Sequence, residues 1–337
     1  MKRIGVGVCL VVATLAAVAV VSSRSQEAGA AQPAADNAAP LTRNWAGGNP
    51  LKIALLKWYQ ANLVPTSFNV GKTQNSNPYG IAFDGENIWT ANNGEGTVTK
   101  LRASDGTVLG NFDAGESPIG IAFDGANMWV TNWLPNGTIT KLRASDGKKL
   151  GTYTLGQFPF WLAFDGENIW VANGPGVTKL RARDGKNLGT FKLQEGAFAV
   201  AFDGSYIWVT GGGRNTVTRL REDGSVAGQF QVGSHPFGIA FDGANIWTAN
   251  DGDGTVTKLR ASDGKLLGTF TVCCGPYGIA FDGANIWVSV GIALYELRAS
   301  DGQVIGNFNA LPGSTGVAFD GANIWVALGL GDNVLKF

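Results

Sequence analysis

A four-residue phrase, Ala-Phe-Asp-Gly, occurs seven times in this sequence and limits its possible folds more than any other feature. Successive copies start 38 to 41 residues apart, and each is followed at a fixed distance by a tryptophan. The aspartates of the phrase and the tryptophans that follow them are Asp84 and Trp89, Asp124 and Trp129, Asp165 and Trp170, Asp203 and Trp208, Asp242 and Trp247, Asp282 and Trp287, and Asp320 and Trp325. A fixed period of this length indicates one supersecondary unit repeated and stacked on its neighbours.

One unit, residues 236–275, shows what is repeated. Four segments rich in β-branched and aromatic residues alternate with short turns, and they read FGIAFD, NIWTAN, TVTKLRAS and KLLGTFTV. Glycine supplies the positive φ that such turns need, which agrees with the 49 glycines of the chain. Four short antiparallel strands in about 40 residues are typical of a propeller blade. We expect one tryptophan and one phenylalanine per unit to fill the layer between blades.

The last unit predicts how the array ends. Residues 316–337 supply three strands, and a fourth is missing. The segment TSFNVG, residues 66–71, matches the fourth-strand pattern of the other units. We therefore expect an all-β fold, a seven-bladed β-propeller over residues 66–337, in which the N-terminal strand completes the last blade. Pairing there would close the ring and remove the exposed edges of an open array.

The segment before the propeller is expected to have three parts. Two basic residues precede an apolar run of 18 residues, 4–21, which predicts a secretory signal peptide over residues 1–30. The alternative is an uncleaved membrane anchor, because the run approaches the length of a membrane-spanning helix. Residues 31–48 are expected to be a flexible linker, and residues 49–65 a short amphipathic helix packed on the propeller. The sequence thus predicts an exported protein that is periplasmic, cell-surface or secreted.

The charge balance narrows the range of partners. Lys and Arg together number 26, as do Asp and Glu, so the net charge is zero, and there is no basic run. The sequence therefore gives no electrostatic reason to expect nucleic acid. Contact with a membrane is expected only through the N-terminal segment, if that segment stays uncleaved. The expected partner is a small ligand, a glycan or a protein.

Two adjacent cysteines, Cys273 and Cys274, remain if the signal peptide is removed. Exported proteins meet oxidising conditions, so a disulfide is expected that is either vicinal or intermolecular, and we predict the vicinal one. Neighbouring Cα atoms lie about 3.8 Å apart, whereas ordinary disulfides join Cα atoms about 4.4–6.8 Å apart. Such a bridge would be strained and easily reduced.

Several phrases resemble a known family. MWVTN at residues 128–132, TVTKLRASDGKLLGTFTV and VGSHPFGIAFDG are similar to the YVTN-type bacterial β-propeller family, and more distantly to NHL and streptogramin-lyase-like propellers. The resemblance implies the propeller fold, whereas function varies from binding platforms and surface-layer components to occasional enzymes. The virginiamycin B lyase branch implies a metal-assisted lyase with several histidines and a glutamate. His235 is the only histidine here, so no catalytic residue is carried over from that branch.

The variable loops mark the expected site. In a propeller of this type, the loop from strand four to the next strand one and the loop from strand two to strand three open on one face. These loops differ among the units, whereas the other two turns are nearly uniform and indicate a structural role. Aromatic residues after the first loop, Phe198 among them, are expected to ring the central opening and suit a small ligand or peptide. The ligand-binding candidates are Tyr79, Trp133, Phe160, Trp161, Arg214, His235, Phe237 and Tyr277.

Each candidate has a structural alternative. The aromatics could pack against strand starts, and His235 could be a solvated loop residue. Trp133 and Trp161 add aromatics where the repeat needs none, which favours binding. Asp251 and Asp253 are weak metal candidates, because two carboxylates fall short of the roughly six to eight oxygens that Ca²⁺ takes.

The sequence therefore predicts a binding or scaffold module without catalysis, using the loop face around the central channel near blades 5 and 6. No cofactor and no firm metal site are predicted. Nucleophile and metalloprotease motifs are missing from the sequence. The alternative is a propeller-type hydrolase or lyase in which His235, the only catalytic candidate, acts as general acid and base with a carboxylate of the same face.

Overall fold

The computed structural model describes residues 65–337 except residues 195, 212 and 274, and every structural statement below concerns these residues. The predicted signal peptide, linker and short helix lie outside them, apart from Pro65 at the end of the helix prediction. The described residues form strands joined by turns, without a helix among them. This part of the chain accordingly holds no helix that could span a membrane.

Five four-stranded antiparallel sheets follow one another along the chain, and each corresponds to one repeat unit. Unit 1 contains β2 (Pro78–Phe83), β3 (Asn87–Asn92), β4 (Thr97–Arg102) and β5 (Val108–Asp113). Unit 2 contains β6 (Pro118–Phe123), β7 (Asn127–Asn132), β8 (Gly137–Arg143) and β9 (Lys149–Gly156). Unit 3 contains β10 (Pro159–Phe164), β11 (Asn168–Asn173), β12 (Gly176–Arg181) and β13 (Asn187–Lys192). Unit 4 contains β14 (Val200–Phe202), β15 (Ile207–Gly211), β16 (Thr216–Leu220) and β17 (Val226–Gln231). Unit 5 contains β18 (Pro236–Phe241), β19 (Asn245–Asn250), β20 (Thr255–Arg260) and β21 (Leu266–Thr271).

Units 6 and 7 share one sheet of seven strands because a long strand, β25, belongs to both. The strand order of this sheet is β1-β27-β26-β25-β24-β23-β22. The strands are β22 (Ile279–Phe281), β23 (Asn285–Ser289), β24 (Gly291–Arg298), β25 (Val304–Phe319), β26 (Ile324–Leu328), β27 (Asn333–Lys336) and β1 (Thr66–Asn69). β1 pairs antiparallel with β27, and Phe68 lies opposite Val334. The strand from the N-terminal side thus lies next to the third strand of unit 7.

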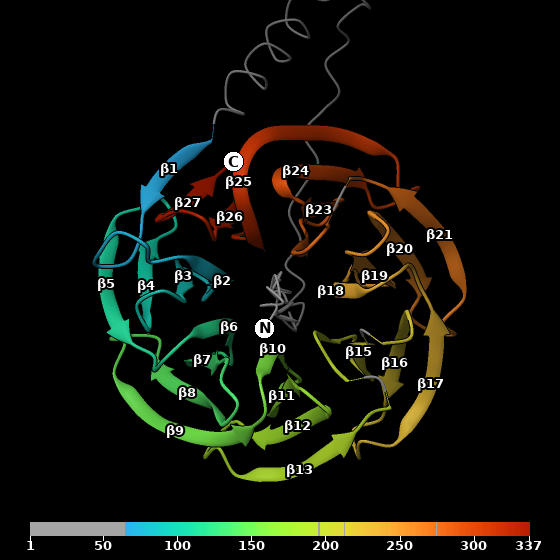
Figure 1. Ribbon diagram of the computed structural model, residues 1–337, viewed down its shortest axis with the longest axis horizontal. Coiled ribbons are helices and arrows are strands. Elements are labelled where there is room, and N and C mark those ends of the chain that lie inside the picture. Colours follow the sequence, from blue (N-terminus) through green and yellow to red (C-terminus); the bar gives the residue numbers. More distant parts are fainter. Residues whose placement is uncertain (1–64, 195, 212, 274) are drawn as a thin grey trace, which may run out of the picture. The chain divides into compact units, whose positions relative to one another are not determined.

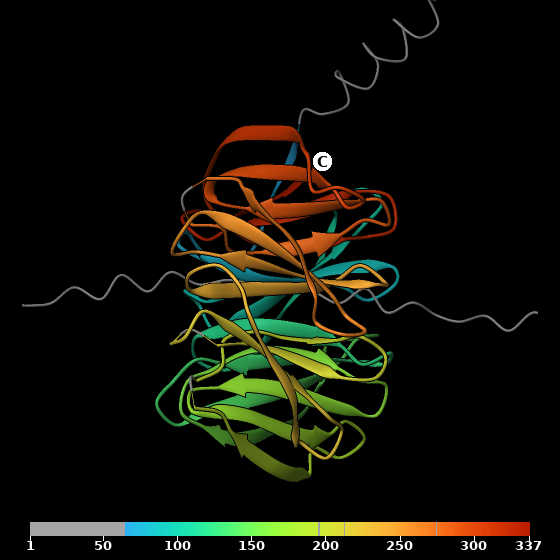
Figure 2. The same cartoon turned by 90° about the vertical axis from the view of Figure 1, so that its right-hand side faces the viewer.

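The first strand of each unit is the inner one, and these strands contact one another in the cyclic order β2, β6, β10, β14, β18, β22, β25 and back to β2. Figure 1 shows the sheets radiating from a common axis, and Figure 2 shows their twist edge-on. The two kinds of variable loop share a face, as predicted: the N–H of Asn93 donates to the carbonyl of Asn77 over 3.1 Å, and that of Ala114 to Gly96 over 3.0 Å. The repeated antiparallel sheets confirm a β-propeller.

The repeated aspartate and tryptophan stabilise each unit together. In unit 2, the indole Nε1–H of Trp129 donates to Oδ2 of Asp124 over 2.8 Å, while Oδ1 accepts the backbone N–H groups of Ala126 and Asn127. The same indole–carboxylate bond is present in all seven units. The tryptophan also packs on an aromatic ring of the fourth strand, as Trp129 does on Tyr153 at 5.7 Å. One carboxylate therefore closes the tight turn and satisfies a buried donor, which explains why the repeat keeps Asp and Trp at a fixed distance.

In six of the seven units, a cation on the third strand joins the unit to the next one. Lys141 Nζ donates to the carbonyl of Ala182 in unit 3 over 2.6 Å and lies 5.0 Å from the ring of Trp129. Lys336 of unit 7 makes the same contact with Ala103 of unit 1 over 2.8 Å. We call these cations the strap residues; they are Lys100, Lys141, Lys179, Arg219, Lys258 and Lys336. They donate hydrogen bonds to backbone carbonyls in the turn of the neighbouring unit.

Candidate functional site

Each loop that leads into an inner strand ends in a residue with positive φ. Glycine fills this position in three units, but the other four carry Asn77 (φ 47°), Ser117 (φ 53°), Phe158 (φ 44°) and His235 (φ 54°). The backbone is held there by the loop between strands two and three, as when Asp251 N–H donates to the carbonyl of His235 over 3.0 Å. A left-handed conformation costs an ordinary residue about 1–2 kcal/mol. Phe158 and His235 are therefore held in a strained backbone conformation at the mouth of the loop face.

A β-bulge follows this position and directs the next side chains. The pairing of β18 with β19 shifts register between Pro236 and Ile239, and β10 shows the same shift between Pro159 and Leu162. A bulge bends the strand and changes where its side chains point. In both strands the bulge contains the aromatic residue that follows the proline. A proline followed by an aromatic residue thus places an aromatic ring at the bulge of the inner strand.

These rings form a continuous series, which we call the aromatic arc. Phe198 stacks on Phe237 at 4.6 Å between ring centroids and meets Phe160 edge-on at 5.3 Å. The imidazole of His235 lies 5.9 Å from Phe198 and 5.6 Å from Phe237, and Tyr277 lies 6.2 Å beyond Phe237. The members of the arc are Trp133, Phe158, Phe160, Phe198, His235, Phe237 and Tyr277. They come from the loop face of units 2 to 6.

Trp133 and Phe158 form the outer end of the arc. Their rings are 5.1 Å apart, and Trp133 also lies 5.9 Å from Phe160. The backbone N–H of Phe158 donates to the carbonyl of Leu134 over 2.8 Å, so the loops of units 2 and 3 are tied together here. The indole Nε1–H of Trp133 is buried without an acceptor. A half-buried ring with an unused donor is a feature that folding alone does not require.

The polar part of the site lies beside the arc in units 4 and 5. His235 Nδ1 is 3.5 Å from Oδ2 of Asp251, and these side chains are 47% and 20% exposed. The backbone N–H of His235 donates to Oδ1 of Asn215 over 3.0 Å. Arg214 precedes Asn215 and is exposed. An exposed imidazole beside a carboxylate has the chemistry for binding a polar group and for general acid–base exchange.

The weak metal candidates separate into two roles. Asp251 faces His235, whereas Asp253 holds the loop itself: it accepts the backbone N–H of Ser234 over 2.7 Å and the hydroxyl of Thr255 over 2.6 Å. Within the described ranges, no three or more His, Cys, Asp or Glu side chains gather as a metal site would need. Asp253 is thus engaged within its own loop, and Asp251 lies beside His235.

The cysteine pair is only half described. Cys273 is half-buried and packs against the hydrophobic cluster between units 5 and 6. Cys274 lies outside the described residues. The vicinal disulfide stays a prediction.

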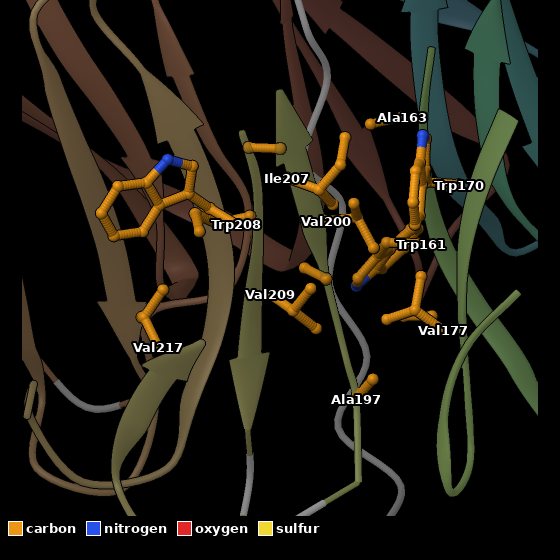
Figure 3. Close-up of a cluster of buried hydrophobic side chains, with 14 of the residues drawn as sticks. Trp161, Ala163, Trp170, Val177, Ala197, Val200, Ile207, Trp208, Val209 and Val217 are labelled. Atoms are coloured by element: carbon orange, nitrogen blue, oxygen red, sulfur yellow. The ribbon is translucent and has the colours of Figure 1, made fainter. Parts of the chain in front are cut away.

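Trp161 lies in the core and not on the exposed loop face where the sequence led us to expect it. Its side chain is fully buried, in a cluster with Val177, Ala197 and Val209 between units 3 and 4 (Figure 3). Unit 4 carries Ala199 at this position and the five remaining units carry glycine, because a Cβ on Gly120, for example, would lie 2.5 Å from a carbonyl of the next unit. In unit 3 the backbone N–H of Trp161 donates to the carbonyl of Phe198 of unit 4 over 3.3 Å, and the indole is accommodated between the two units.

The remaining candidates lie near the arc. Phe160, Phe237 and Tyr277 are largely buried, and Tyr79 is half-buried against the same cluster. Sequence reasoning missed Phe158 and Asn215. Phe158 could have been found from the sequence, because it directly precedes Pro159, just as His235 directly precedes the equivalent Pro236 two units later.

Repeated antiparallel sheets around an axis, with variable loops gathered on one face, define the chain as a β-propeller with a candidate binding site on the loop face. No family model and no curated protein matches the sequence.

Solved structures with a similar fold include two lyases and a synthase. The virginiamycin B lyase from Staphylococcus aureus has a TM-score of 0.69 and 20% identity, over 81% of this chain and 98% of that one. A streptogramin B lyase has a TM-score of 0.69 and 19% identity, over 80% and 96% of the two chains. The hydrazine synthase of Kuenenia stuttgartiensis has a TM-score of 0.67 and 17% identity, over 79% and 97%. At these identities the likeness shows the fold, that of streptogramin B lyase-like β-propellers.

Proposed function

We propose that this chain is an exported β-propeller that binds a small ligand, a glycan or a protein segment through the aromatic arc, without catalysis. The observation that carries the proposal is the strained backbone of Phe158 and His235. Glycine would remove that strain at both positions, yet two large rings are kept there, and both join the arc. Strain of this kind is concentrated at binding and catalytic sites.

A ligand screen with matched variants tests this proposal. We expect glycans, peptidoglycan fragments or metal ions tried in turn to include one that raises the Tm of the full chain. His235→Ala and Trp133→Ala should then lose the shift. Asn77→Ala is the matched control, because Asn77 has the same backbone conformation in unit 1 and is not a member of the arc. No Tm shift with any probe would refute the small-ligand form and favour a protein partner.

A second function is favoured by the His235–Asp251 pair. We propose as the alternative that the imidazole acts as general acid and base, oriented by the carboxylate 3.5 Å away. Two of the similar structures are lyases, which supports trying a streptogramin B as substrate. Turnover that falls at least tenfold in His235→Ala but not in Asn77→Ala would support catalysis. Unchanged turnover in His235→Ala would refute the proposal that His235 is a catalytic residue.

We also propose seven blades closed by β1, in a repeat of the YVTN type. Seven Asp–Trp pairs, the cyclic contacts of the inner strands and the β1–β27 pairing support this architecture. A further bond supports the closure: the hydroxyl of Thr315 in unit 7 donates to the carbonyl of Pro78 in unit 1 over 3.2 Å.

We also propose, from the sequence alone, that the protein is exported and that it has the vicinal disulfide. N-terminal sequencing of the protein recovered outside the cytoplasm should find a start near residue 31; an intact N-terminus would favour a membrane anchor. Two thiols that react with a labelling reagent in the non-reduced exported protein would refute the Cys273–Cys274 bridge.

A further inference from the structure

Apolar side chains are exposed where the outermost strand of a unit begins. In unit 1 they are Val108 and Leu109 at the start of β5. In unit 6 they are Val304 and Ile305 at the start of β25. The equivalent exposed residues of units 2 to 5 are Leu150, Leu188, Val226, Leu266 and Leu267. We call all of these the rim residues. They directly follow the uniform turn between strands three and four, so they lie on the side of the propeller opposite the loop face.

A bulge explains why two neighbouring side chains are exposed together. Consecutive residues of a regular strand point to opposite faces of the sheet. The pairing of β4 with β5 shifts register between Lys100 and Leu101, so Leu109 is left without an opposite residue. The pairing of β24 with β25 shifts in the same way beside Ile305. A bulge redirects a side chain, and each such strand therefore starts with an exposed apolar pair.

The exposed pairs are distributed unevenly around the propeller. The first position of the pair is apolar in units 1, 4, 5 and 6, whereas Lys149 and Asn187 occupy it in units 2 and 3. The fully apolar pairs of units 6 and 1 are thus the ones on either side of unit 7. Neighbouring exposed apolar side chains on a surface mark an interaction site more often than scattered ones do.

The start of β1 is where the preceding part of the chain reaches this rim. Thr66 pairs with Lys336 in the way that Gly110 pairs with Lys100 in unit 1. By this register, residues 64–65 correspond to the apolar pair of unit 1. Figure 1 shows β1 running from this start toward β5 of unit 1. A chain that enters β1 without reversing its direction therefore comes from the side of unit 6.

The sequence just before β1 has the pattern of an amphipathic helix. Leu51, Leu55 and Trp58 recur at helical spacing and form an apolar stripe, while Lys57 and Gln60 fall on the other side of such a helix. A helix over residues 49–64 would be about 24 Å long. It would end directly at the rim, because only Pro65 separates it from β1.

We propose that residues 49–64 form a helix whose apolar stripe packs on the rim of unit 6, against Val304 and Ile305. The short connection to β1 keeps the segment beside the rim at a high effective concentration. Entry into β1 from the side of unit 6 brings the stripe over this pair without a turn of the chain. Packing would remove both the stripe and the pair from water. It would also hold the N-terminal side of the chain away from the loop face.

Trypsin cleavage after Lys57 in the full chain, followed by mass spectrometry, tests the proposal. We expect Ile305→Glu to speed this cleavage about tenfold, because a charge beneath the apolar stripe releases the segment and cleavage follows the released population. Leu188→Glu is the matched control, since it changes the same position in unit 3. Ile305 and Leu188 are equally accessible, at 43% and 42% exposed. The control should be cleaved at the rate of the unchanged protein.

Trp58→Ala tests the same contact from the side of the segment. We expect it to speed cleavage as Ile305→Glu does, and we expect the double variant to add little to either change, because both remove one contact. Ile305→Ser replaces Ile305→Glu if the latter loses its cooperative unfolding transition.

Three results would overturn the proposal. The first is equal cleavage after Lys57 in Ile305→Glu, Leu188→Glu and the unchanged protein. The second is faster cleavage in Leu109→Glu but not in Ile305→Glu, which would place the helix on unit 1. The third is a dimer, seen by light scattering, that Ile305→Glu dissociates without faster cleavage, because a second copy would then cover the rim.

Discussion

Glu296 occupies the position on the third strand where the six other units carry a strap residue. Its Oε1 accepts the Nδ2–H of Asn285 over 2.9 Å. A strap residue of unit 6 would reach for the turn between strands three and four of unit 7, but there β27 and β1 are not joined by a turn, since β1 comes from the N-terminal side. The carbonyls that a lysine needs are therefore missing, and the carboxyl group is left largely buried.

Burial of Glu296, and secondarily the charge of Asp282, raise the pKa of this carboxyl above its ordinary value of 4.5. A raised carboxyl pKa means that the folded state holds the proton more tightly, so ionisation costs stability as pH rises through the ordinary value to the raised one. Glu296→Gln should therefore stabilise the protein at pH 7, since Gln keeps the acceptor for Asn285. At pH 3, where Glu296 is protonated in both states, the gain should vanish. Urea unfolding at both pH values measures this, and an equal gain at pH 3 would contradict it.

At this scale the sequence was informative for some residues and not for others. The fixed spacing of Asp and Trp was plain in the sequence, whereas the hydrogen bond that joins the two side chains in every unit was not predicted from it. Trp161 could not be placed from sequence, because it is buried by side chains of the next unit, such as Ala197 and Val209, which only the fold brings beside it. The backbone strain at Phe158 was equally hidden, since positive φ before a proline follows from the loop hydrogen bonds and not from residue type.

At the scale of strands and turns, the strap residues are the most regular link between units. Each combines a hydrogen bond to a backbone carbonyl with a cation–aromatic contact about 5 Å from a tryptophan ring centre. Their stems cover the tryptophan, while their charge meets the next turn. The cation thus serves two neighbouring sheets at once.

Removing one strap should destabilise the fold. Lys141→Met keeps the apolar stem but loses the bond to Ala182 and the contact with Trp129, so we expect a loss of about 1–3 kcal/mol. Lys148→Met is the control, because Lys148 is an exposed lysine on the following turn. Urea unfolding compares the two. Equal stability of both variants would show that the straps add nothing measurable.

Most strands could be predicted from the sequence, because the apolar segments and glycine turns recur with one period. The bulges in the inner strands could not, since they depend on pairing with the second strand. The turn between strands three and four of unit 4, LREDG at residues 220–224, is one residue shorter than in units 1, 2, 3, 5 and 6, and this was visible in the sequence. The cavity beside that turn, lined by Glu222 and Trp170, is visible only in the structure.

For the molecule as a whole, the pairing of β1 with β27 brings the two ends of the described sequence into one sheet. Phe68 of β1 packs on Trp325 at 5.5 Å, the same pairing that other units make within a continuous stretch of chain. Its ring also lies against Gly106 of unit 1, where a Cβ would come within 2.0 Å of it. One side chain thus connects unit 7 with unit 1.

Phe68→Ala should lower the free energy of unfolding by about 3–5 kcal/mol, as expected for loss of a packed phenylalanine. Ser67→Ala is the control: it removes only an exposed hydrogen bond from Asn333, and we expect a change below about 0.5 kcal/mol. Chemical denaturation followed by tryptophan fluorescence measures both. A loss for Phe68→Ala no greater than for Ser67→Ala would mean that β1 contributes little to the fold.

The straps all run in one direction, from the third strand of one unit to the turn of the next. Except at the boundary between units 6 and 7, where Glu296 replaces the strap residue, a run of consecutive units therefore has a donor edge at one end and an acceptor edge at the other, as in a head-to-tail assembly. If the chain were severed between two units, the fragments would carry matching edges on both sides. The propeller is thus suited to reconstitution from separate pieces, and a reporter split between two such fragments would be brought together by the contacts that hold the intact chain.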